Sequence, residues 1–138
     1  MLQRLQTLYL TLGALLLALF VAVGETWAEA IGDSVPWLGT VGYVLAGVTA
    51  LVALVAVALY KDRATQRRVI AAAQWLDLAL VAVVLVGLYI AFDSSAGTAP
   101  VGYYYVAMMP IVAYVLLRMA RQRVVADIER VRSMDRIR

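Results

Sequence analysis

Four long apolar stretches constrain this chain more than any other feature. They cover about residues 5–24, 35–60, 69–92 and 100–117, and Asp77 is the one acidic or basic residue inside them. A helix that crosses the hydrocarbon core of a bilayer needs about 20 apolar residues at a rise of 1.5 Å each. The sequence therefore predicts an all-α integral membrane protein, with four transmembrane helices in a single domain.

Composition supports this class and excludes several kinds of site. Hydrophobic residues make up 64% of the 138 residues and charged residues only 15%, so lipid must serve as most of the solvent. Cysteine and histidine are absent, which excludes disulfides, thiolate or imidazole metal ligands and Ser-His or Cys-His nucleophiles. No phosphate-binding glycine motif occurs either. We expect no catalytic residue, no metal site, no cofactor and no enzyme activity.

The basic residues predict the orientation of the four spans. Arg4, the KDRATQRR connection at 61–68 and the tail after residue 117 contain every Lys and Arg, while the other two connections contain only carboxylates. Positive charge beside membrane helices is retained in the cytoplasm. We therefore expect a multi-pass protein of a bacterial cytoplasmic (inner) membrane with both termini inside. The same clustering beside apolar segments favours contact with membrane lipid and argues against nucleic acid.

Three smaller patterns complete the reading of the spans. The first stretch is too long for the apolar region of a signal peptide, so we expect a retained helix. Aromatic residues near the span ends are expected in the headgroup zone; they are Trp27, Trp37, Tyr60, Trp75, Tyr89 and Tyr103 to Tyr105. Gly42, Ala46 and Ala50 repeat every fourth residue and predict a stripe where a neighbouring helix approaches closely.

Asp77 and Gln74 form the candidate polar site inside the membrane. An intramembrane carboxylate is costly and is therefore a functional candidate by default. Two interpretations stay open. One is a polar clamp near the cytoplasmic interface, satisfied by water, an arginine or a tyrosine; the other is a site for a proton or small cation.

Residues 118–138 are expected to continue the fourth helix as a cytoplasmic amphipathic tail. Apolar residues recur there at helical spacing, and Arg123, Asp127 and Arg130 are spaced for ion pairs along the helix. The apolar stripe needs cover, which lipid headgroups, the 61–68 connection or another protein can each provide. The candidate contact residues are Val124, Ile128, Val131, Arg132, Asp135 and Arg136.

Three short segments, MLQRLQTLYL, LYKDRATQRR and VRSMDRIR, give the chain a family resemblance. Together they resemble an uncharacterised bacterial family of small four-helix inner-membrane proteins, found mainly in the Bacteroidota and known as a domain of unknown function. The resemblance implies the same topology and brings no activity. It directs attention to a cytoplasmic rim formed by Gln3, Arg4, Gln6, Arg63, Gln66 and Arg67. Tyr9, Tyr60, Ser133, Arg138 and the tail residues Arg132, Asp135 and Arg136 match the family pattern too, and all are expected at the cytoplasm or its interface.

Two functions are compatible with these features. The first is a non-catalytic subunit or scaffold of a membrane complex, whose rim and tail contact a protein partner or a second copy of the chain. The alternative is a minimal oligomeric transporter or channel for protons or small cations that uses Asp77. The sequence identifies neither a substrate nor a partner.

Overall fold

The computed structural model describes residues 2–31, 35–94 and 101–135, and these ranges contain helices and no strands. The helices are α1 (Leu2–Val23), α2 (Glu25–Ile31), α3 (Pro36–Ala58), α4 (Arg63–Ser94) and α5 (Val101–Asp135). All except the short α2 are long and apolar enough to cross a membrane. The predictions of an all-helical fold and of four apolar helices are therefore confirmed.

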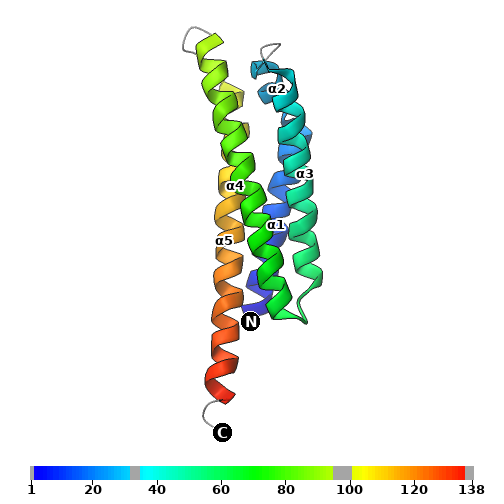
Figure 1. Cartoon of the computed structure of the whole chain (residues 1–138), viewed down its shortest axis with the longest axis vertical. Coiled ribbons are helices and arrows are strands. Elements are labelled where there is room, and N and C mark those ends of the chain that lie inside the picture. Colours follow the sequence, from blue (N-terminus) through cyan, green and yellow to red (C-terminus); the bar gives the residue numbers. More distant parts are fainter. Residues whose placement is uncertain (1, 32–34, 95–100, 136–138) are drawn as a thin grey trace.

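The four long helices run up and down in an antiparallel bundle (Figure 1). Each packs against two neighbours: α1 against α3 and α5, and α4 against the same two helices. The N-terminus and the α3–α4 turn lie at one end of the bundle, and α5 projects beyond them at that end (Figure 1). The short helix α2 lies at the opposite end and contacts α3, α4 and α5.

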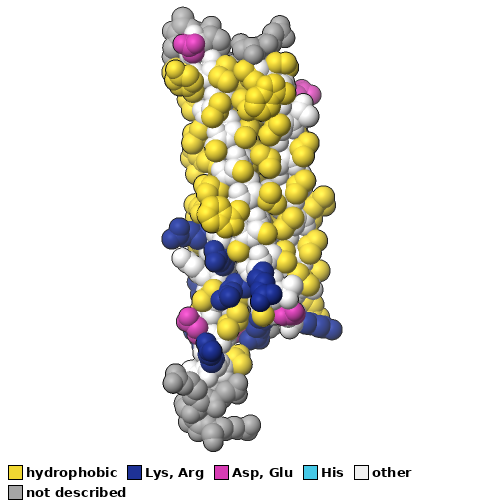
Figure 2. Space-filling view, in the orientation of Figure 1, with side chains coloured by type: hydrophobic (Ala, Val, Ile, Leu, Met, Phe, Trp, Pro, Cys, Tyr) yellow, Lys and Arg dark blue, Asp and Glu magenta, His cyan; other side chains and the backbone are white. Residues whose placement is uncertain are grey.

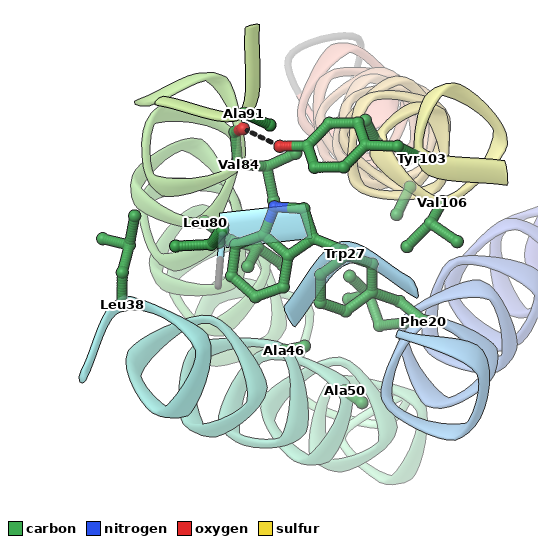
Figure 3. Close-up of a cluster of buried hydrophobic side chains, with 14 residues drawn as sticks. Phe20, Trp27, Leu38, Ala46, Ala50, Leu80, Val84, Ala91, Tyr103 and Val106 are labelled. Atoms are coloured by element: carbon green, nitrogen blue, oxygen red, sulfur yellow. Dashed lines mark hydrogen bonds between the residues drawn. The ribbon is translucent and has the colours of Figure 1, made fainter. Parts of the chain in front are cut away.

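A single tryptophan from α2 fills the core at this opposite end. Trp27 is fully buried beside Phe20 and lies between α3 and α4 (Figure 3). Glycines on those two helices make room for it, since a Cβ on Gly42 would overlap the Trp27 ring and a Cβ on Gly87 would lie 2.9 Å from Trp27 Nε1. The predicted close approach at Gly42 is thus made by the Trp27 ring.

Two of the aromatic residues expected in the headgroup zone belong to the core instead. Trp27 and Tyr103 have no exposed surface, and the Tyr103 hydroxyl donates a 2.9 Å hydrogen bond to the Val84 carbonyl oxygen (Figure 3). Proximity to a span end does not distinguish a ring turned outward from one turned inward, so the sequence-based expectation was wrong for these two. Trp37, Tyr60, Trp75, Tyr89, Tyr104 and Tyr105 do lie exposed.

Towards the other end the core is made of small side chains. Ala53 and Ala56 of α3 and Ala73 of α4 are buried in a cluster with Leu10, Leu117 and Val124. Outside, leucine and valine side chains remain exposed along the bundle, and hydrophobic side chains cover the upper part of the face drawn in Figure 2. A continuous apolar exterior over a close-packed interior is the arrangement that lipid solvation favours.

Candidate functional site

Asp77 is buried in the bundle without a polar neighbour that satisfies it. Its side chain is 0% exposed, and neither carboxyl oxygen has a hydrogen-bond partner among the described residues. The expected clamp by an arginine or a tyrosine is therefore wrong for the described part of the chain. An unpaired carboxylate charge costs several kcal/mol in such surroundings, so Asp77 is a costly residue at this position.

Gln74, one turn before Asp77, belongs to a different environment. Its Oε1 accepts a 3.1 Å hydrogen bond from Nη1 of Arg121 on α5. The candidate pair is therefore divided: Gln74, 7% exposed, is hydrogen-bonded to the neighbouring helix, whereas Asp77 is fully buried and has no such partner among the described residues. No group of three or more carboxylates that could hold a metal ion occurs within the described ranges.

The candidate rim divides in the same way between surface and interior. Arg67 is exposed and Arg63 is partly exposed, as expected of a rim. Gln6 and Gln66 are only 6% and 2% exposed, so the expectation that they face the cytoplasm or its interface was wrong. For Gln3 and Arg4 the backbone lies in α1, while their side chains are outside the described residues.

Gln66 is buried because it completes the end of α3. Its Nε2 donates a 2.8 Å hydrogen bond to the Ala56 carbonyl oxygen, in the last turn of that helix. Carbonyls of the last turn have no partner within their own helix. A glutamine from the next helix supplies that partner, and this role explains why a polar side chain lies in an alanine-rich core.

Asp62 sets the start of α4 by capping it. Its Oδ1 accepts a hydrogen bond from the Thr65 backbone N–H at 3.1 Å, and its Oδ2 accepts one from the Thr65 hydroxyl at 2.6 Å. Side-chain acceptors at this position satisfy the free N–H groups of the first turn. The Thr65 hydroxyl, followed by the backbone N–H, holds the pKa of the Asp62 carboxyl below its ordinary value of 3.8.

The tail continues α5 without interruption from Val101 to Asp135, passing Pro110. Val124 is fully buried, and Ile128 packs against the alanine-rich cluster, so this part of the stripe is covered by the protein itself. Val131 is 45% exposed and Met134 66% exposed. Arg132 is exposed too, whereas the Asp135 side chain and Arg136 lie outside the described residues.

Asp127 holds the tail to the bundle by an ion pair that the sequence did not predict. Its Oδ2 lies 3.0 Å from Nη1 of Arg63 at the start of α4. Neither Arg123 nor Arg130 lies within salt-bridge distance of Asp127 among the described residues, so the expected pairs along the helix are replaced by one between helices. Helical spacing identifies only neighbours on the same helix. The approach of α4 to α5 is visible only in the three-dimensional structure.

A groove between α4 and α5 is a further feature that the sequence did not reveal. Gln74, Trp75 and Leu78 line it from α4, and Tyr114, Arg118 and Arg121 line it from α5. The spacing of Arg118 and Arg121 already placed both on one face of a helix. The sequence does not indicate that this face of α5 lies opposite Gln74 and Trp75.

Comparison with known protein families matches residues 2–137 to one described as a domain of unknown function, DUF4293. No curated protein and no solved structure matches the chain.

Proposed function

Because the chain belongs to the DUF4293 family, a domain of unknown function that spans nearly its whole length, we propose its role from its geometry alone. In this proposal the protein is a non-catalytic component of a membrane complex in a bacterial cytoplasmic membrane. It binds a protein partner at the projecting end of α5.

The proposed placement rests on the distribution of apolar and charged surface. Four helices have the length and hydropathy of membrane spans. On the face drawn in Figure 2, the Lys and Arg side chains gather at the end from which α5 projects, below the apolar surface. The positive-inside rule then puts this end, with both termini, in the cytoplasm.

One observation carries the docking proposal: the apolar stripe of α5 continues past the surface that covers it. Val124 and Ile128 pack on the bundle, but Val131 and Met134, one and two turns further on, are exposed. Arg130 and Arg132 flank them and are exposed as well. An apolar ridge with basic neighbours complements a partner surface that is apolar and acidic.

Site-specific photo-crosslinking in cells tests this proposal. A photoreactive amino acid at Met134 should give a discrete protein adduct, and Val131→Glu should remove it because a buried charge at the ridge opposes docking. The same amino acid at Ser133, which points away from the ridge on the helix, serves as the matched control. Equal adducts at Ser133 and Met134, or adducts to lipid alone, would contradict the proposal. Mass spectrometry of the adduct distinguishes a second copy of the chain from a different protein.

A second candidate function rests on Asp77. A protonatable group buried without a partner is a possible relay for protons through the bundle, in an oligomer large enough to enclose a path. Proton flux into proteoliposomes measures it directly. Under this alternative Asp77→Asn abolishes the flux while the thermal stability is unchanged; flux that is equally low for the wild type and for the variant rules it out.

A further inference from the structure

The groove between α4 and α5 joins two kinds of surface in one site. It has a volume of about 530 Å³, within the range of small-molecule sites. On the α4 side Trp75 is 71% exposed and Leu78 41% exposed, and both are apolar. On the α5 side the lining includes two cationic side chains, Arg118 and Arg121.

The two arginines hold positive charge that the described residues do not neutralise. Arg63 is paired with Asp127 at 3.0 Å, whereas neither Arg118 nor Arg121 has a carboxylate within salt-bridge distance in the described part of the chain. Arg121 donates one N–H to Gln74 Oε1, which orients the guanidinium and leaves further donors for a ligand. Guanidinium groups one turn apart on a helix can both reach one phosphate group.

The position of Arg118 along α5 determines what kind of ligand fits. It is the first charged residue after the apolar run that begins at Val101. The site therefore lies where the apolar exterior meets the basic end of the molecule, which is the depth of lipid phosphates when the protein is in a bilayer. A molecule that fills the whole groove needs an anionic group for the arginines and a hydrocarbon part for Trp75 and Leu78.

We propose that this groove binds one anionic phospholipid of the cytoplasmic leaflet. Arg118 and Arg121 hold the phosphate, and the hydrocarbon part of the lipid nearest the phosphate lies against Trp75 and Leu78. Glu129 lines the groove two turns beyond Arg121, away from the apolar surface. Its carboxylate opposes a second negative charge there and accepts hydrogen bonds from hydroxyl groups, so the favoured headgroup has a single phosphate and a neutral polyol, as in phosphatidylglycerol.

Native mass spectrometry of the detergent-purified protein tests this proposal, which rests on the membrane placement proposed above. With equal amounts of phosphatidylglycerol and phosphatidylcholine added, the wild type should retain one phosphatidylglycerol at least tenfold more often than phosphatidylcholine. The double variant Arg118→Gln and Arg121→Gln should lose that preference. Arg121→Gln removes the charge while retaining an amide that can donate a hydrogen bond.

The matched control carries the same charge change outside the groove. Arg67 and Arg68 are exposed on α4 and do not line the groove. The variant Arg67→Gln and Arg68→Gln should keep the preference within about twofold of the wild type. An equal loss in both double variants would show general attraction of anionic lipid to the basic end and would overturn the proposal, as would an unchanged preference in the groove variant.

Two further measurements distinguish a lipid in this groove from a simple anion site and from a lipid bound elsewhere. Excess inorganic phosphate should leave the bound lipid in place, because it lacks the hydrocarbon that Trp75 and Leu78 contact; displacement would reveal a simple anion site and overturn the proposal. Brominated phosphatidylglycerol should quench the tryptophan fluorescence more strongly than brominated phosphatidylcholine does. This difference should disappear in Trp75→Phe. An excess that persists in that variant would place the lipid at another surface of the protein.

These tests can contradict the lipid-binding proposal and the protein-docking proposal separately. The groove variant should still form the crosslinked adduct at Met134, and Val131→Glu should still retain phosphatidylglycerol. A wild-type protein that retains phosphatidylglycerol but gives no adduct at Met134 would contradict the proposed docking role alone and leave the lipid site intact.

Discussion

At the scale of single residues, Trp27 shows how one large ring depends on the absence of two side chains. The ring is held between Gly42 of α3 and Gly87 of α4, where a Cβ on either glycine would overlap the indole. Such a fit adds the large apolar contact of an aromatic ring to a core otherwise rich in small residues. The stability of this end of the bundle therefore depends on glycine at these positions.

Gly42→Ala is predicted to destabilise the protein by about 1–3 kcal/mol, the usual cost of overfilling a packed core. Gly47→Ala on the same helix is the matched control, because a Cβ there meets nothing within 4 Å. That control should be neutral or slightly stabilising, since alanine favours helix over glycine. Thermal unfolding in detergent measures both stabilities. Equal melting temperatures for the two variants would contradict the proposed packing of the Trp27 ring against Gly42.

At the scale of elements, the turn between α3 and α4 is fixed by polar side chains with separate tasks. Asp62 caps the start of α4 through Thr65, and Gln66 completes the end of α3 through the Ala56 carbonyl oxygen. Together they define where one helix ends and the next begins. The α5 tail adds a third connection at this end through Arg63 and Asp127.

The Asp62 cap predicts a pH dependence of stability. Because the pKa of the folded carboxyl is lowered from 3.8, its contribution is fully present above that value and is lost as the pH falls through the lower, folded pKa. Asp62→Asn should not lose stability through protonation of this side chain. The melting temperatures of the wild type and of Asp62→Asn should therefore converge as the pH falls below 3.8. Asp93→Asn, at the exposed far end of α4, is the control; a constant difference between wild type and Asp62→Asn at all pH values would refute this account.

The packing of the α5 tail predicts that a glutamate substitution changes the stability at position 128 and not at position 131. Ile128→Glu should destabilise the monomer by about 1–3 kcal/mol because Ile128 packs on the alanine-rich cluster. Val131→Glu should leave the melting temperature unchanged, since Val131 is 45% exposed. Thermal unfolding of the two purified variants decides the matter, and a stable Ile128→Glu protein would mean that the tail does not rest on the bundle.

The length and period of the apolar stretches were enough to predict the four long helices and the continuation of α5, whereas the short α2 was expected to be part of a connection. They were not enough for contacts that depend on which helices are neighbours. Tyr103 shows the difference, since a tyrosine at a span end is compatible with either a headgroup position or the core. The pairing of Arg63 with Asp127 and of Gln74 with Arg121 likewise joins residues far apart in the sequence, so no local spacing indicates it.

At the scale of the whole molecule, the distribution of charge predicts a single orientation in the membrane. Glu25, Glu29 and Asp93 lie near the end that holds α2, while the described Lys and Arg residues lie near the other end together with Asp62, Asp127 and Glu129. Membrane insertion retains positive charge on the cytoplasmic side, so one of the two orientations is strongly favoured.

Cysteine labelling of intact cells measures this orientation. Arg67→Cys should react with a membrane-impermeant reagent only after the cytoplasmic side is opened, whereas Asp93→Cys should react from outside. Both side chains are exposed, so a failure to react reflects the membrane and not burial in the protein. The reverse pattern would overturn the topology, and labelling of both cysteines from outside would contradict a single orientation.

The uninterrupted length of α5 has a mechanical consequence. Its 35 residues span about 52 Å at 1.5 Å per residue, while the hydrocarbon core is only about 30 Å thick. In the proposed membrane placement, this one continuous helix therefore passes from lipid into water. A change of about 10° in its tilt, pivoting at the bilayer face, shifts an end about 20 Å away by about 3–4 Å. In that placement, a bilayer thickness that changes the tilt of α5 would displace a partner bound at Met134.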